Sequence, residues 1–136
     1  MLRRDHRADF LRAVPLFSSC SKRELRRIAA IADEIDVGEG KLLARQGDPG
    51  RELFVLLEGT VKVERDGVQV NTLGPGDFVG EGALLLRKPR NATVTTTSSV
   101  RALVITDNSF QRLLDDDPKI SAKVLDTAAE RTPPGD

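Results

Sequence analysis

The chain has 136 residues, in which 21 lysines and arginines balance 21 aspartates and glutamates, so its formal net charge is zero. That length predicts one domain with a core of its own, and the balanced charge provides no field that would draw the chain onto nucleic acid or a membrane. One cysteine, Cys20, and one histidine, His6, exclude an internal disulfide and a histidine-rich metal site. The sequence contains neither a secretory signal nor a membrane segment. We therefore expect a cytoplasmic protein without a metal.

The first part of the chain predicts helices. A short helix is expected around Asp9–Ala13 and should end before Pro15, because proline disfavours the helical conformation of the residue preceding it. Ser21 and Glu24 have the spacing of a capping box, which indicates that a second helix starts after Ser21. Its core-facing stripe would consist of Leu25, Ile28, Ala29 and Ala32.

The middle of the chain, from about Ile35 to Thr106, consists of short β-rich runs separated by glycine turns. We expect strands at Lys41–Arg45, Leu53–Leu57, Thr60–Arg65, Val68–Leu73, Ala92–Thr97 and Val100–Thr106. Asp66-Gly67 suits a type I′ hairpin turn, in which both central residues have positive φ. Short strands at this spacing favour a sandwich or a barrel.

The last part returns to helix. Asp107 is a candidate N-cap of one helix, and Asp117 of another with Pro118 at its first position. These patterns give three expected regions: an N-terminal extension over residues 1–9, a domain over 10–131 and a disordered tail over 132–136.

Residues 76–93 interrupt the β pattern, because two glycines flank Glu81 and an apolar run then leads to Pro89-Arg90. One helical turn at Glu81–Leu86 would present the backbone N–H groups of Gly82 and Ala83 to an anion. The Arg90 guanidinium could bind phosphate oxygens in a charge-assisted fork. A carboxylate repels phosphate, so Glu81 suits a neighbouring hydroxyl instead. An anion beside a hydroxyl describes a ribose phosphate.

These residues resemble the phosphate-binding cassette of the cyclic nucleotide-binding domain family. The matching segments are Gly80-Glu81, Ala83-Leu84-Leu85 and Pro89-Arg90-Asn91-Ala92-Thr93. Further similarity lies in Val14-Pro15-Leu16-Phe17, Gln46-Gly47-Asp48, Leu53–Leu57 and Gly59–Val63, so the resemblance covers roughly residues 10–130. It implies an α+β, mainly β fold: an antiparallel double-stranded β-helix, a jelly-roll-like barrel, with N-terminal and C-terminal helices.

The resemblance also implies roles for single residues. Glu81 would accept the ribose 2′-hydroxyl, Arg90 would pair with the exocyclic phosphate oxygens, Ala83 would donate its backbone N–H, and Gly80 would lie at the sugar. The remaining ligand-binding candidates are Gly82, Asn91, Ala92, Val63 and Val70, the two valines at the base.

The sequence departs from the family pattern at three cassette positions. Val79 replaces a common aromatic residue and Gly82 an aliphatic one. Asn91 offers both a donor and an acceptor, so it leaves the base undecided between cAMP and cGMP, of which we favour cAMP. No other cofactor is implied.

The resulting hypothesis is a non-enzymatic sensor whose C-terminal helix, Pro118–Arg131, resembles a lid that moves when ligand binds. It would signal to an effector protein or to a second copy through the terminal helices. One alternative is a degenerate relative that serves as a protein–protein interaction module, and another is a regulatory fragment of a larger transcription factor, channel or kinase. An enzyme on a cupin-like barrel would need a metal site that His6 alone does not provide.

Overall fold

The computed structural model describes residues 4–81, Leu84 and residues 88–130. Its helices are α1 (Arg4–Arg12), the 3-10 helix η1 (Pro15–Phe17), α2 (Lys22–Ala30), α4 (Asp107–Asp116) and α5 (Pro118–Glu130). Its strands are β1 (Asp33–Val37), β2 (Leu42–Ala44), β3 (Glu52–Glu58), β4 (Val61–Arg65), β5 (Val68–Leu73), β6 (Phe78–Val79), β7 (Thr93–Thr96) and β8 (Val100–Thr106).

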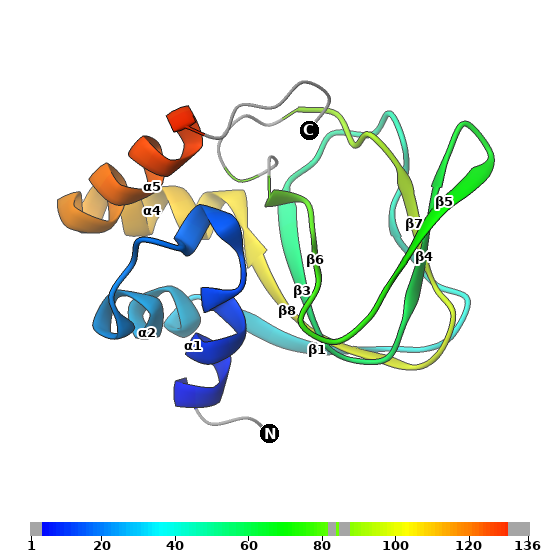
Figure 1. Cartoon of the computed structure of the whole chain (residues 1–136), viewed down its shortest axis with the longest axis horizontal. Coiled ribbons are helices and arrows are strands. Elements are labelled where there is room, and N and C mark those ends of the chain that lie inside the picture. The colour runs from blue at the N-terminus through cyan, green and yellow to red at the C-terminus, as the bar shows by residue number, and fades with distance from the viewer. Residues whose placement is uncertain (1–3, 82–83, 85–87, 131–136) are drawn as a thin grey trace.

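The strands form two antiparallel four-stranded sheets, one in the order β1-β8-β3-β6 and one in the order β2-β7-β4-β5. The helices lie on one side of the first sheet, and the second sheet lies on the other side (Figure 1). The expected α+β fold with flanking helices is therefore present. The expected closed barrel is not: no strand ladder joins the two sheets within the described residues, so both sheets are open.

Two apolar clusters explain this layering. The larger cluster packs the helices on the first sheet and includes Leu53, Val55 and Leu57 of β3. The smaller cluster fills the space between the sheets and includes Leu56 of β3 with Val61 and Val94. Because side chains alternate along a strand, β3 is buried on both faces, which explains its unbroken apolar run.

The helix predictions hold in part. The capping box is confirmed, since the Glu24 backbone N–H donates to Ser21 Oγ (3.2 Å) and the Ser21 N–H donates to Glu24 Oε1 (2.7 Å). The first helix begins at Arg4, earlier than expected. The predicted N-cap Asp107 is wrong: Thr106 caps α4, with its Oγ1 accepting from the Ser109 N–H at 3.2 Å.

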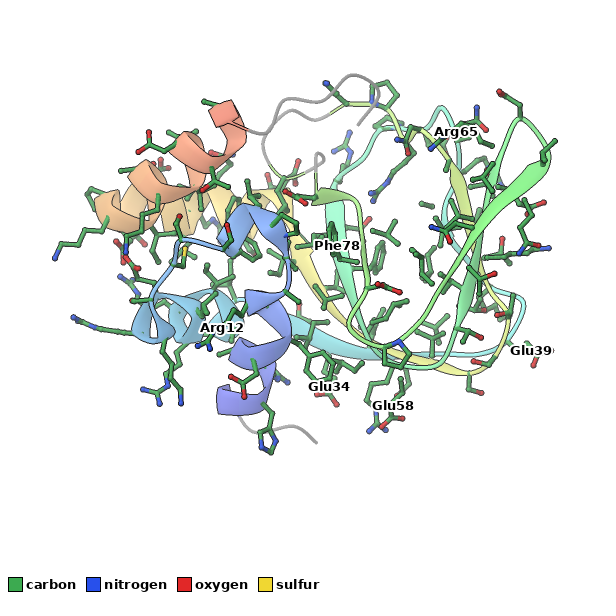
Figure 2. The ribbon with its side chains drawn as sticks, viewed as in Figure 1. Arg12, Glu34, Glu39, Glu58, Arg65 and Phe78 are labelled. Carbon is green, nitrogen blue, oxygen red and sulfur yellow. The ribbon has the colours of Figure 1, made fainter. Side chains whose placement is uncertain are left out.

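The strand predictions are confirmed except at β1 and β6. The hairpin turn has positive φ at both Asp66 (53°) and Gly67 (80°), as type I′ requires. Strand β1 was missed because its sequence is acidic. Its carboxylates instead lie beside Arg101 of β8, whose Nε is 3.7 Å from Glu34 and 3.0 Å from Asp36. Arg101 Nη1 also lies 3.7 Å from Glu58 at the end of β3, and Figure 2 shows Glu34 and Glu58 in the same lower part of the view.

Candidate functional site

Arg90 is held by a short backbone ladder between two loops. Its N–H donates to the Asp48 carbonyl (2.8 Å), and its own carbonyl accepts from the Gly47 N–H (2.8 Å). An isolated antiparallel bridge joins Pro49 to Pro89 beside them. The position of Arg90 is therefore fixed by main-chain contacts with residues some forty positions earlier, at the entrance to β3.

Of the two terminal nitrogens of the Arg90 guanidinium, Nη2 forms a hydrogen bond and Nη1 forms none with the described residues. Nη2 donates to the Glu52 carbonyl at 2.9 Å, and the guanidinium carbon lies 6.0 Å from the centre of the Phe54 ring. Nη1 is buried and has no hydrogen-bond partner in the described part of the chain. Burial lowers the pKa of Arg90, an effect that the negative charge of Glu52 opposes, but the guanidinium remains charged at neutral pH. A buried donor without an acceptor fits a site that receives an anion.

Gly80 lies against this guanidinium. It has φ +90°, a conformation that other residues rarely adopt. A Cβ atom at Gly80 would overlap both Arg90 Nη1 and the Glu52 carbonyl oxygen. The chain can therefore pass this close to Nη1 only with glycine at position 80.

The cassette continues into the core from Gly80. Glu81 is half-buried in helical conformation, and Leu84 is fully buried in the helix-side cluster. The Leu84 carbonyl accepts a long hydrogen bond (3.4 Å) from Gln111 Nε2 of α4. The cassette thus has a direct contact with the C-terminal helices. Gly82 and Ala83, the predicted backbone donors, lie outside the described residues.

The other predicted ligand-binding residues occupy different environments. Val63 on β4 is half-buried against the inter-sheet cluster, and its cross-strand partner is Asn71 because the register shifts after Val63. Val70 on β5 is 51% exposed. Asn91 is exposed and its carbonyl accepts from Arg65 Nε (3.1 Å), whereas Ala92 is buried. These four positions stay predictions.

Sequence reasoning missed two contributors to the site, Glu52 and Phe54. Glu52 acts through its backbone carbonyl, which no side-chain pattern reveals. Phe54 lies within an apolar run that indicates core. Consecutive side chains of a strand point to opposite faces, so Phe54 points away from the helix side, where Val55 lies, and toward the inter-sheet face with Arg90. The Gln46-Gly47-Asp48 similarity was the available signal for the loop that holds Arg90.

Neither a metal-binding cluster nor a membrane-spanning helix is present among the described residues. No group of three or more histidine, cysteine, aspartate or glutamate side chains among them is arranged to hold a metal ion. No helix in the described ranges combines the length and the apolar character needed to cross a membrane.

Comparison with known proteins identifies the family. The profile of the cyclic nucleotide-binding domain matches residues 34–117, more than half of the chain. The chain therefore belongs to the cyclic nucleotide-binding domain family.

The chain is similar to proteins of different kinds. The chain is 36% identical over 131 residues to the cyclic nucleotide-gated potassium channel mll3241 of Mesorhizobium japonicum; the match covers 92% of this chain and 36% of the channel. The N-terminal domain of a transcriptional regulator from Streptomyces coelicolor A3(2) superposes with a TM-score of 0.83 at 32% identity, covering 90% of this chain and 91% of that one. The cAMP-bound PfPKA-R (141-441) superposes with a TM-score of 0.70 at 25% identity, covering 93% and 46%.

Proposed function

We propose that this chain is a cyclic nucleotide sensor that binds cAMP in preference to cGMP and performs no catalysis. The observation that carries the proposal is the buried, unpartnered Nη1 of Arg90 beside Gly80. The folded chain already buries the positive charge of Arg90. Its Nη1 has no acceptor among the described residues, so a bound ligand can supply one. A single phosphate with two exocyclic oxygens suits a guanidinium fork.

The roles proposed for the cassette follow from this placement. Arg90 pairs with the exocyclic oxygens of the cyclic phosphate, and Gly80 lies at the sugar. Glu81 follows Gly80 in the chain, and its carboxylate accepts a hydrogen bond from the ribose 2′-hydroxyl. The backbone N–H groups of Gly82 and Ala83 complete the anion site.

The proposed base contacts come from the second sheet. Val63 and Val70 would contact the base face, with Asn91 and Ala92 at the point where the cassette enters β7. The cAMP-bound relative PfPKA-R supports adenine over guanine. Asn91 lies at the position whose side chain helps to choose the base, and its amide, with a donor and an acceptor, is compatible with either base.

The proposed signal passes through α5, which is docked on the N-terminal helices by three polar contacts. Lys123 Nζ lies 2.5 Å from Glu24 Oε1, Ser19 and Thr127 share a hydroxyl hydrogen bond (3.2 Å), and Arg27 pairs with Asp117. Ligand shifts a conformational equilibrium only by its differential affinity for the two states. In the proposed movement, α5 leaves α2 to cover the base. The contacts of α5 with the N-terminal segment stabilise its docked position, so they lower the affinity for the nucleotide.

That mechanism predicts that breaking the Lys123–Glu24 contact tightens nucleotide binding. Lys123→Met should raise the affinity for cAMP several-fold, because the docked state loses stability relative to the bound state. Lys119→Met, on the same helix and exposed, is the matched control and should leave the affinity unchanged. Weaker binding by Lys123→Met alone would show that α5 stays docked when ligand binds.

The binding proposal itself is tested by calorimetric titration with cAMP, cGMP and 5′-AMP. We expect heat of binding with both cyclic nucleotides, tighter binding of cAMP, and much weaker binding of 5′-AMP, whose phosphate carries a different charge and geometry. Absence of heat and of any thermal shift with both cyclic nucleotides at millimolar concentration would refute the function.

The relatives also support a regulatory place within a larger assembly. The chain spans 36% of the length of the channel relative. We propose that the effector is a partner protein or a second copy, contacted through the terminal helices.

A further inference from the structure

A depression of about 570 Å³ lies between α2 and α4, away from Arg90 and Gly80. Its lining residues are Arg23, Arg26, Arg27, Ala30, Ile31, Ser109, Arg112, Leu113 and Asp116. None of them belongs to the cassette. The depression is therefore a surface separate from the proposed nucleotide site.

The charge of this depression is strongly one-sided in a chain whose net charge is zero. Its lining contains four arginines and one carboxylate, Asp116. A second carboxylate, Asp117, lies nearby and forms an ion pair with Arg27. Two positive charges are left in excess. Arg23 and Arg112 form no ion pair with any described residue, and both are exposed.

The base of the depression is apolar. Leu113 of α4 is buried beneath it, and Ala30 and Ile31, at the C-terminal end of α2, also line it. Guanidinium groups around an apolar base suit a partner that presents carboxylates next to aliphatic side chains, because guanidinium is weakly hydrated and binds carboxylate in a fork.

We propose that the depression between α2 and α4 docks an acidic, leucine-containing segment of a partner protein. The carboxylates of that segment pair with Arg23 and Arg112 across the depression, while its apolar side chains cover Ile31 and Leu113. The proposal is independent of whether the cassette binds a nucleotide.

The test uses a fluorescein-labelled peptide of three Glu-Glu-Leu-Leu repeats, measured by anisotropy at low salt. The native chain should bind it, and Arg23→Gln combined with Arg112→Gln should weaken binding at least tenfold with an unchanged melting temperature. The matched control replaces two lysines away from the depression, the exposed Lys41 just before β2 and the half-exposed Lys62 of β4, by glutamine, and should bind like the native chain. A peptide with Gln in place of Glu should bind weakly to all three proteins.

Several results would overturn the proposal. Failure of the native chain to bind the acidic peptide, or equal loss in the lysine control, would show that the arginines form no specific site. Self-association of the native chain that the arginine variant abolishes, measured by sedimentation, would assign the surface to a second copy. Binding to phosphatidylserine vesicles without binding to the peptide would assign it to a lipid surface.

Discussion

Replacement of Arg90 by alanine separates a binding role from a structural one, because the two roles predict different free energies. In the ligand-free protein the substitution removes a hydrogen bond from a charged donor to the Glu52 carbonyl, worth about 1.5–3 kcal/mol, and a cation–π contact of about 0.5–1 kcal/mol. It also removes a buried charge with an unpartnered Nη1, which contributes in the opposite direction by about 1–3 kcal/mol. The net change in the free energy of unfolding should therefore lie between a gain of about 1 kcal/mol and a loss of about 3 kcal/mol.

In the complex the same substitution removes one partner of a buried charge pair. Such truncations cost about 2–5 kcal/mol, which corresponds to a loss of cAMP affinity of roughly 30-fold to several thousand-fold. Urea denaturation of the free protein and calorimetric titration with cAMP measure the two quantities on one preparation. A large loss of stability with an unchanged affinity would refute the reasoning, since Arg90 would then support the fold alone.

Three further predictions concern the cassette and the docked helix. Gly80→Ala should cost about 1–2 kcal/mol for its positive φ alone and weaken cAMP binding at least tenfold, whereas Gly74→Ala, with open space around it, should do neither in melting and titration experiments. Glu81→Gln should reduce the preference for cAMP over its 2′-deoxy analogue, which we expect to be about 10–100-fold in the native chain; an undiminished preference in the titrations would contradict its role. Hydrogen bonding from Lys123 lowers the pKa of Glu24 below 4.5, so the stability it contributes is present above that pH and is lost as the pH falls through the lowered pKa. Urea midpoints between pH 7 and pH 3 should therefore fall less steeply in Lys123→Met than in the native chain, and parallel curves would rule this out.

Local signals in the sequence predicted the parts of the fold that short-range chemistry determines. The capping box at Ser21 and the type I′ turn at Asp66-Gly67 depend only on residues within a few positions of each other, and both are confirmed. Strand β1 was missed because its acidic residues are stabilised by Arg101, more than sixty positions away. The two-residue strand β6 exists only because β3 offers it a partner.

The candidate site shows the same division. The guanidinium of Arg90 suggested a phosphate ligand, and the resemblance to the phosphate-binding cassette suggested Gly80. It gave no sign that the two lie in contact, because that contact depends on the loop at Gly47 and on the Glu52 carbonyl. The prediction of the α4 N-cap was wrong for a related reason. Thr106 and Asp107 are both good N-cap residues, and the helix starts directly after β8 ends at Thr106.

The central claim is that the unpartnered nitrogen of Arg90 receives a cyclic phosphate, and a crystal structure of the chain grown with cAMP tests it most directly. We predict an exocyclic phosphate oxygen within hydrogen-bonding distance of Arg90 Nη1, the ribose beside Gly80, and the 2′-hydroxyl on Glu81. Nucleotide bound elsewhere, with Arg90 still engaged only with the Glu52 carbonyl, would contradict the account.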